Sequence, residues 1–314
     1  MGGYELKLVA DEVEEHMNIK ILEVVFSPSA SPRLDGAAPF FIDNLNPGWR
    51  ELQAYAEIYR SGDYKTADLV GVFSPKFSIK AGISVDEFRK FVRKSPAGDV
   101  FFINPFPQIA YRSLNVWMQG ELAHPGLVNL AKELLSVVGV HCPVEPDVRQ
   151  GPDILCYCNF WAGTPKFWEE YVGGVLMPIV EFLEVEHDSG LVSHIMSDTA
   201  HTVPAPFIPF IVERLFTAFI QSRPSIVSKA WKHDMRDIIE NFCLNDFERI
   251  MVQGMAEEID LLDLEGSQAF SSRIRHRMWL NSMLAQQHHD DYYQFVPHPH
   301  SGVTLRGDLG ETQQ

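Results

Sequence analysis

The stretch from Asp68 to Phe106 constrains the fold more than any other part of the chain. It opens with an apolar run at 69–73, continues through a polar loop at 74–82 into a helical pattern, and closes with a second apolar run at 100–103. A strand, a loop, a helix and a second strand in this order form the unit of a parallel sheet. The sequence therefore predicts a fold of the α/β class built around this unit.

The helix within this stretch carries its own start signal. Ser84 is suited to the N-cap position, and Glu87 three residues later completes a capping box. Val85, Phe88 and Val92 repeat at helical spacing. A helix is therefore predicted to begin after Ser84 and to bury this apolar face against the sheet.

Polar residues follow both predicted strands. Ser74 and Lys76 come directly after the first strand, Lys80 lies in the same loop, and Asn104 follows the second strand. Ligands of parallel sheets bind beyond the carboxyl ends of the strands, and a helix start offers backbone N–H groups to phosphate. We therefore expect an anionic ligand here. The alternatives are two solvated lysines and, for Asn104, a turn formed by its own side chain.

Composition limits the classes of partner. The 314 residues include 26 Lys and Arg against 42 Asp and Glu, a formal net charge of -16. This balance argues against nucleic acid as a partner, although it permits one local basic pocket. The four cysteines match no zinc or redox spacing, which predicts free thiols and a cytoplasmic location. No apolar run has transmembrane length, and no D-x-D follows an apolar strand, so a metal site is not evident.

Four segments are predicted along the chain. Residues 1–18 form a loose lead-in, 19–225 an α/β domain, 226–291 a helical region packed on it, and 292–314 a disordered tail. The polar run at 288–291 is predicted to be solvated, because neighbours in sequence do not share a helix face.

Two further elements carry candidate residues. Residues 154–161 alternate as a strand should, which places Asn159 and Trp161 at the end of a strand. Residues 165–186 form a long helical pattern that Pro178 must kink or divide.

Glu213 and Arg214 interrupt a strongly apolar helix predicted over 207–219. Charged residues are rarely buried without a partner. Adjacent residues point about 100° apart around a helix, so each is expected to need a partner of its own. Glu213 is then either one half of a structural ion pair or a carboxylate that projects into a cleft as a general base.

The order of these motifs resembles that of a bacterial capsule or O-antigen polysaccharide glycosyltransferase of the GT-A type. The resemblance spans 19–223 by order of elements and rests on four segments: DLVGVFSPK at 68–76, DVFFINPF at 99–106, CNFWAGTPKFW at 158–168 and PFIVERLF at 209–216. It implies a GT-A-like, Rossmann-related, mainly parallel mixed sheet flanked by helices. It also implies sugar transfer from a nucleotide-sugar donor to a saccharide or lipid-linked acceptor.

The resemblance also assigns roles, with Glu213 as the catalytic base. Donor contacts fall to Ser74, Lys76, Lys80 and Asn104, and substrate contacts to Asn159, Trp161 and Arg214. Mn²⁺ or Mg²⁺ is the implied cofactor, but the usual D-x-D is missing, so metal dependence stays open. The alternative is a catalytically inert α/β nucleotide-binding or scaffolding protein that keeps the fold.

One more segment, 271–284, bears on location. Arg273, Arg275 and Arg277 lie beside Met278 and Trp279. This pattern is compatible with peripheral contact to the inner face of a membrane or to a lipid-linked acceptor. The alternative is an amphipathic helix packed on the domain, because alternate spacing spreads the arginines around the helix.

Overall fold

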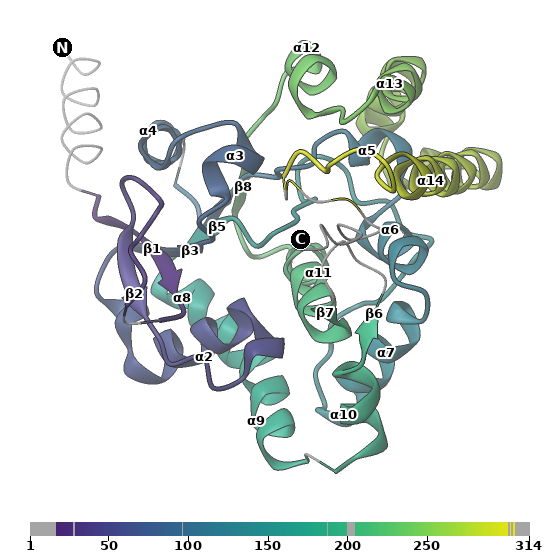
Figure 1. The fold of residues 1–314 in the computed structure, drawn as a ribbon. Coiled ribbons are helices and arrows are strands. Elements are labelled where there is room, and N and C mark those ends of the chain that lie inside the picture. Colours follow the sequence, from purple (N-terminus) through teal and green to yellow (C-terminus); the bar gives the residue numbers. More distant parts are fainter. Residues whose placement is uncertain are drawn as a thin grey trace, which may run out of the picture.

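The structure is a computed structural model. It describes residues 17–27, 29–95, 97–186, 188–199, 205–300, 302 and 304. Over this part of the chain a mixed, mainly parallel sheet is flanked by helices, and a largely helical region completes the C-terminal side (Figure 1). The fold class predicted from the sequence is confirmed at this level.

The main sheet has six strands in the order β2-β1-β3-β5-β4-β8. Their bounds are β1 (Ile19–Val25), β2 (Ala38–Phe41), β3 (Leu69–Phe73), β4 (Val100–Phe102), β5 (Trp161–Gly163) and β8 (Ser228–Ala230). β5 runs antiparallel to both of its neighbours, whereas the other pairs are parallel. The start of β5 therefore lies at the same edge of the sheet as the carboxyl ends of β3 and β4.

The sheet is buried on both faces, which explains the near-continuous apolar runs of its strands. In β3, Leu69 and Phe73 join one apolar cluster, and Val70 and Val72 join the cluster on the opposite face. The first cluster includes Phe88 of the predicted helix.

Helices α3 (Phe77–Ala81) and α4 (Val85–Lys94) cover the first face. The second face packs against α2 (Glu51–Ser61), α8 (Pro165–Trp168), a π-helical segment (Glu169–Leu176), α9 (Met177–Val185) and α11 (Phe207–Ser222). The predicted capping box of α4 is confirmed, because Ser84 Oγ accepts from the Glu87 N–H at 3.2 Å and Glu87 Oε2 accepts from the Ser84 N–H at 2.8 Å.

The remaining helices lie mostly on the C-terminal side, where α13 and α14 pack on each other (Figure 1). They are α5 (Ile109–Arg112), α6 (Val116–Ala123), α7 (Leu127–Val137), α10 (Gly190–Ile195), α12 (Met235–Asp237), a second π-helical segment (Ile238–Phe242), α13 (Asp246–Glu265) and α14 (Ser272–Tyr292). Short 3-10 turns (Pro47–Trp49, Asp63–Lys65, Ser267–Ala269) and a two-stranded ribbon of β6 (Asp198–Thr199) and β7 (Ala205–Pro206) complete the fold.

The strand predicted over 154–161 is wrong. Residues 154–160 form turns, and the strand begins only at Trp161. Cys158 and Asn159 have φ angles of 59° and 53°, which lie in the left-handed region that L residues rarely occupy and that no strand can contain. These two residues turn the chain at the carboxyl edge of the sheet and direct it into β5.

The predicted division of the helix near Pro178 is confirmed. The pattern over 165–186 is split into α8, the π-helical segment and α9, and Pro178 lies in the first turn of α9. Because proline has no N–H to donate, regular helical hydrogen bonding cannot continue through it unchanged.

Two expected segment boundaries differ from the structure. β8 lies beyond residue 225 but pairs with β4, so the C-terminal region also contributes to the sheet. The first residues of the expected tail are ordered, because Tyr293 is only 1% exposed. Most of the predicted lead-in, 1–16, and the end of the tail, 305–314, lie outside the described residues.

Candidate functional site

A cavity of about 520 Å³, called here the main cavity, opens at the carboxyl edge of the sheet. Its lining comes from residues after β3 (Lys76, Lys80), after β4 (Phe106, Gln108) and before β5 (Tyr157, Cys158), together with α11 and α14. Four candidates from the sequence line it: Lys76, Lys80, Glu213 and Arg214.

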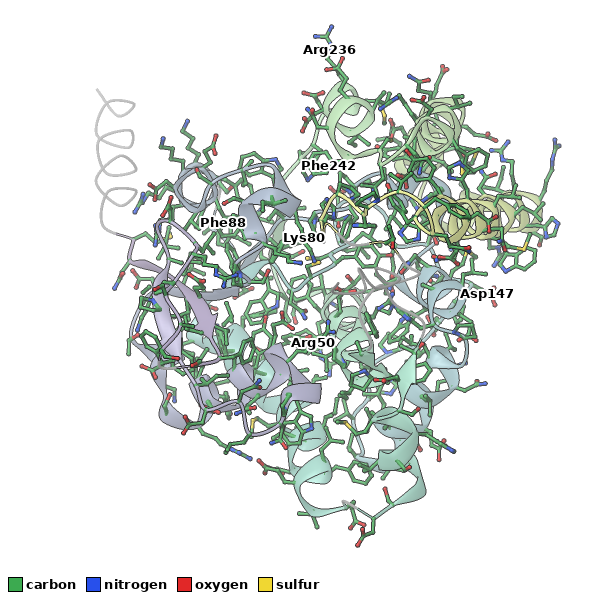
Figure 2. All side chains as sticks on the ribbon, viewed as in Figure 1. Arg50, Lys80, Phe88, Asp147, Arg236 and Phe242 are labelled. Carbon is green, nitrogen blue, oxygen red and sulfur yellow. The ribbon has the colours of Figure 1, made fainter. Side chains whose placement is uncertain are left out.

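Lys80 lies at the centre of this arrangement. Its Nζ is 3.2 Å from Cys158 Sγ and 5.8 Å from the centre of the Phe106 ring. Figure 2 shows Lys80 between the sheet and the C-terminal helices, whereas Arg236 extends from the periphery. The lysine predicted to lie in a polar loop therefore points into the molecule.

The charge of Lys80 is maintained by its neighbours. Burial acts to lower the pKa of Lys80, but Cys158 and Glu213 raise it by more, so its pKa lies above the ordinary lysine value. Burial raises the pKa of the Cys158 thiol to about 12. That thiol is therefore neutral at pH 7 and accepts a hydrogen bond from the Lys80 ammonium, while the Glu213 carboxylate adds negative charge nearby.

Glu213 is fixed from two sides and still faces the main cavity. Its Oε2 accepts from the Cys158 backbone N–H at 2.9 Å, and its Oε1 is 3.4 Å from Nη1 of Arg214. One helical turn later, Thr217 Oγ1 accepts from the Cys156 N–H at 3.0 Å. Two side chains of α11 thus hold the turn that precedes β5. The carboxylate is 22% exposed and can accept further hydrogen bonds.

Arg214 is 2% exposed and extensively hydrogen-bonded. Its Nε donates to the Val116 carbonyl at 3.0 Å, its Nη1 to the Phe210 carbonyl at 2.8 Å and its Nη2 to Gln119 Oε1 at 2.7 Å. The expectation that Glu213 and Arg214 do not face each other is therefore only partly right, because the guanidinium folds back along α11 and reaches Glu213 as well.

Two residues that were expected to contact the nucleotide-sugar donor, Asn104 and Ser74, do not line the main cavity. Asn104 Oδ1 accepts from the Phe106 N–H at 3.0 Å, which is the turn-forming alternative considered above. Asn104 instead lines a smaller cavity of about 200 Å³. Ser74 is half-buried, and its carbonyl accepts from the Phe77 N–H at 2.9 Å in the turn before α3.

The two candidate residues from the segment predicted as a strand at 154–161, Asn159 and Trp161, are buried. Trp161 is 0% exposed and stacks between Tyr55 and Phe216, with ring centres 5.3 and 5.8 Å away. Its ring belongs to the core below the sheet, so the expected stacking on a sugar is not retained. Asn159 is 7% exposed, and its carbonyl accepts from the Tyr55 hydroxyl at 3.4 Å.

Sequence reasoning missed several residues of the main cavity. Gln108 and Tyr157 are 1% and 2% exposed, and Gln108 Oε1 and the Tyr157 hydroxyl lack a hydrogen-bond partner among the described residues. Gln108 follows β4 so closely that its place after the strand could have indicated it. No local signal marks Tyr157, which lies in a segment predicted to be a strand.

The C-terminal segment also contributes to the main cavity. His289, Asp290, His298 and His300 line it, although they were expected in a solvated run and a disordered tail. Burial and the positive charges of Lys80 and Lys76 lower the pKa of His300 to about 4. The histidine is therefore neutral at pH 7 beside two lysines, and this side of the cavity is positive within an acidic protein.

In the described ranges no group of three or more His, Cys, Asp or Glu side chains is arranged to hold a metal ion. No helix in this part of the chain is long and apolar enough to cross a membrane. In α14, Met278 is buried, Arg277 pairs with Glu258, and Arg275 bonds the Asp147 carbonyl at 3.4 Å, so this helix packs on the domain. Its contact with a membrane remains a prediction.

Comparisons with known proteins give little further information. No protein-family model and no curated protein matches this sequence. Among solved structures, the WbbM bifunctional glycosyltransferase is similar at 16% sequence identity and a TM-score of 0.43, over 68% of this chain and 44% of that one. This chain thus spans less than half of that protein, and a likeness at this TM-score does not support an argument about activity.

Proposed function

We propose that the protein is a glycosyltransferase of the GT-A type. It moves a sugar from a nucleotide-sugar donor to a saccharide or lipid-linked acceptor in bacterial surface polysaccharide synthesis. The observation that carries this proposal is that the Lys80 ammonium and the Glu213 carboxylate line one cavity at the carboxyl edge of the sheet. Sugar transfer needs a cation for the leaving diphosphate and a base for the incoming hydroxyl.

The lysines are assigned to the donor. Lys80 is kept charged by its surroundings, and Lys76 lines the same cavity on the exposed side. A diphosphate bound between them would place its negative charge next to two cations in a partly dry site, where such interactions are stronger than in water. His300, neutral at pH 7, can donate or accept one further hydrogen bond.

Glu213 is assigned to the acceptor as general base. The Cys158 N–H and Arg214 hold its carboxylate in place, which leaves lone pairs for an incoming hydroxyl. Arg214 acts as a positioning residue, because its N–H groups are directed mainly to carbonyls and to Gln119. Gln108 and Tyr157 lie beside Arg214 in the lining of the cavity, and Gln108 Oε1 and the Tyr157 hydroxyl have no hydrogen-bond partner among the described residues.

A divalent metal is the cofactor that the family resemblance implies. In enzymes that use it, the ion neutralises the diphosphate, and carboxylate oxygens hold it. The described residues offer no cluster of this kind, so stabilisation of the diphosphate charge falls to Lys76 and Lys80.

Calorimetric titration with a panel of nucleotide sugars, with and without Mn²⁺, tests this proposal. We expect one donor to bind, and Lys80→Met to weaken its affinity at least tenfold. The matched control is Lys94→Met at the exposed end of α4, which should leave the affinity unchanged. Absence of heat with every donor would overturn the proposal. Binding without any transfer or donor hydrolysis would favour the inert nucleotide-binding alternative.

A further inference from the structure

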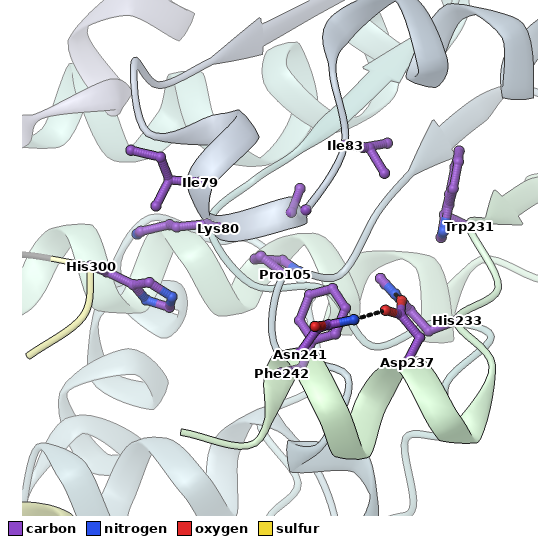
Figure 3. Close-up of a pocket in the computed structure, with 12 residues that line it drawn as sticks. Ile79, Lys80, Ile83, Pro105, Trp231, His233, Asp237, Asn241, Phe242 and His300 are labelled. Carbon is purple, nitrogen blue, oxygen red and sulfur yellow. Dashed lines mark hydrogen bonds and ion pairs between the residues drawn. The ribbon is translucent and has the colours of Figure 1, made fainter. Parts of the chain in front are cut away.

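A second cavity of about 420 Å³ shares two lining residues with the main cavity, Lys80 and His300. These two side chains lie near each other at one end of the second cavity, whereas Trp231 lies at the other end (Figure 3). Lys80 comes from α3, but His300 comes from the chain that follows α14. The two cavities therefore meet between α3 and the chain that follows α14.

Residues 294–300, called here the C-terminal strap, have the sequence Gln-Phe-Val-Pro-His-Pro-His. A proline has no N–H group to donate and restricts the backbone to a narrow range of φ. Two prolines in four residues therefore keep this segment out of helices and out of sheet pairing. Both histidines of the strap, His298 and His300, line the main cavity, whereas both prolines are exposed. The strap thus presents imidazole rings to the cavity and prolines to the solvent.

The strap is attached to the body of the protein at its first end. Tyr293, which directly precedes it, is 1% exposed, and its hydroxyl donates to the Leu244 carbonyl at 3.4 Å. Phe295, two residues later, is already 69% exposed. At the other end His300 rests on the Phe106 ring, with ring centres 5.7 Å apart. A segment that is anchored at one end and held at the other by a ring contact can swing about its anchor.

The strap histidines bring hydrogen-bond donors to the main cavity. The backbone N–H of His300 donates to His298 Nδ1 at 3.2 Å. Because Nδ1 of His298 accepts, the hydrogen of a neutral ring lies on Nε2, which is a donor. A neutral His300 ring likewise carries one N–H, and a protonated ring carries two. Together with the ammonium groups of Lys76 and Lys80, which line the same cavity, these groups form a set of donors from two distant parts of the chain.

The acidic side chains of the described residues that line this cavity, Asp290 and Glu213, have partners of their own. Asp290 Oδ1 accepts from Gln286 Nε2 at 2.8 Å and lies 3.1 Å from His289 Nδ1. Glu213 accepts from the Cys158 N–H at 2.9 Å. Donors and cations therefore predominate where the strap faces α3, and charge-assisted hydrogen bonds from such groups bind anions.

We propose that the strap is a closing element that completes a diphosphate site, with His298 and His300 on one side of the anion and Lys76 and Lys80 on the other. The anion enters while the strap is swung away, and the strap then closes over it. This inference rests on the proposed function for the identity of the anion, which is the diphosphate of the nucleotide-sugar donor.

The charges around His300 couple closure to binding. Without an anion, the ring faces two lysines, and burial together with Lys80 and Lys76 lowers the pKa of His300 to about 4. A bound diphosphate offsets the charge of the lysines and attracts the ring. Because the anion interacts better with the closed strap than with the open one, its binding shifts the strap toward the closed position.

Calorimetric titration with inorganic pyrophosphate tests the strap without a choice of nucleotide. A protein that ends at Phe295 keeps Tyr293 and lacks both strap histidines. We expect it to bind pyrophosphate at least tenfold more weakly than the full chain. The matched control ends at Thr304, which keeps the whole strap, and should bind as the full chain does. Equal or tighter binding by the protein that ends at Phe295 would overturn the proposal.

Point variants test the histidines in a chain of full length, whether or not the shortened protein folds. His298→Ala combined with His300→Ala should also weaken pyrophosphate binding at least tenfold. His276→Ala is the matched control, because this histidine is exposed on α14 and does not line the main cavity. In the wild-type protein, saturating pyrophosphate should slow hydrogen exchange of the amides in 294–300 at least fivefold, which a strap with a purely structural role would not show.

The outcomes separate the strap from the function. If pyrophosphate slows exchange at 76–82 but not at 294–300, and the histidine variants bind normally, the strap proposal is overturned and the transferase proposal stands. If a nucleoside diphosphate binds and pyrophosphate does not, the same variants measured with that nucleotide decide the proposal. If neither pyrophosphate nor any common nucleoside diphosphate binds, both proposals are overturned.

Discussion

Two buried arginines, Arg149 and Arg214, differ in how fully they occupy the carboxylates beside them. Arg149 joins the chain before Gly151 to α13, and Arg214 lies on α11 at the main cavity; each is 5% exposed or less. Arg149 forms a bidentate pair with Asp263 at 2.9 and 2.7 Å, so that carboxylate is largely committed. Glu213 instead makes one long contact of 3.4 Å with Arg214. A buried charge with saturated partners supports the fold, whereas one with unused capacity beside a cavity is available for chemistry.

The surroundings of the two arginines strengthen this contrast. The region where Arg149 and Arg112 meet α13 is called here the α13 junction. In it, Arg149 also donates to the Ala110 and Ser113 carbonyls, and Arg112 pairs with Glu248 at 3.0 Å. These contacts hold α5 against α13. At the main cavity, Gln108 Oε1 and the Tyr157 hydroxyl lack such partners among the described residues. We therefore expect substitutions at the junction to affect stability and substitutions at the cavity to affect turnover.

The largest expected effect is that of Glu213→Gln on turnover. The amide keeps the shape and still accepts from the Cys158 N–H, but it cannot take a proton from the acceptor. We expect transfer to fall by about 10²–10⁴-fold, the usual contribution of a general base. Donor affinity and the urea midpoint should change little. Full turnover in this variant, or failure to fold, would return Glu213 to a structural role.

Asp263→Asn tests the prediction that the α13 junction supports the stability of the fold. It removes the charge that faces the buried Arg149 and keeps the side-chain shape. Breaking a buried pair costs about 3–5 kcal/mol, and we expect the lower end because the Asp263 side chain is 21% exposed. Urea denaturation measures the loss. The turnover of the folded fraction should be unchanged. A variant that loses activity without losing stability would contradict a purely structural role for this junction.

Gly120→Ala should have an intermediate effect. A Cβ at Gly120 would overlap Arg214 Nε, which is fixed by its bond to the Val116 carbonyl. Overpacking of this kind costs about 1–3 kcal/mol. Gly254→Ala in α13 is the matched control, because a Cβ there meets nothing within 4 Å. That control should gain about 0.5–1 kcal/mol from helix propensity. Equal effects of the two substitutions would show that Arg214 is not tightly packed.

The smallest expected effect is a pH dependence from His300. Its folded-state pKa is lowered to about 4 by burial and by Lys80 and Lys76, whereas the unfolded value is about 6.5. The stability contributed by the neutral ring is therefore present above pH 6.5 and is lost as the pH falls toward 4. We expect faster hydrogen exchange around residue 300 at pH 5 than at pH 7, after correction for intrinsic rates.

A variant isolates His300 from the other groups at the cavity. His289, His298 and Asp290 line the same space. His300→Asn should remove most of the pH effect if His300 is its source. A bound diphosphate should reverse the sign, because its charge favours the protonated ring, so that donor affinity rises as the pH falls from 7.5 to 5.5. An unchanged profile in the variant would assign the effect to the other histidines.

Sequence patterns predicted the fold well where the signal is local. The capping box at Ser84, the apolar runs of β3 and β4 and the break at Pro178 depend on residues a few positions apart. The turn at Cys158 and Asn159 could not be predicted, because it is held by Glu213, more than fifty residues later. β8 was missed because three half-buried residues leave no apolar pattern.

The candidate site was predicted in part for the same reason. Lys76 and Lys80 follow a recognisable strand, and Glu213 is an evident charge in an apolar helix. His300 and Tyr157 reach the main cavity only through tertiary packing. The burial of Trp161 was not predicted, because alternation in a sequence indicates where a strand ends but not whether that end is buried.

Hydrogen–deuterium exchange with saturating nucleoside diphosphate tests the central claim most directly. The claim is that the main cavity, which Lys80 and Glu213 line, binds the donor. We predict slower exchange at 76–82 and 156–160, and no change at the junction around Arg149. Slower exchange at the junction alone, or no change with any of the common nucleoside diphosphates, would contradict the claim.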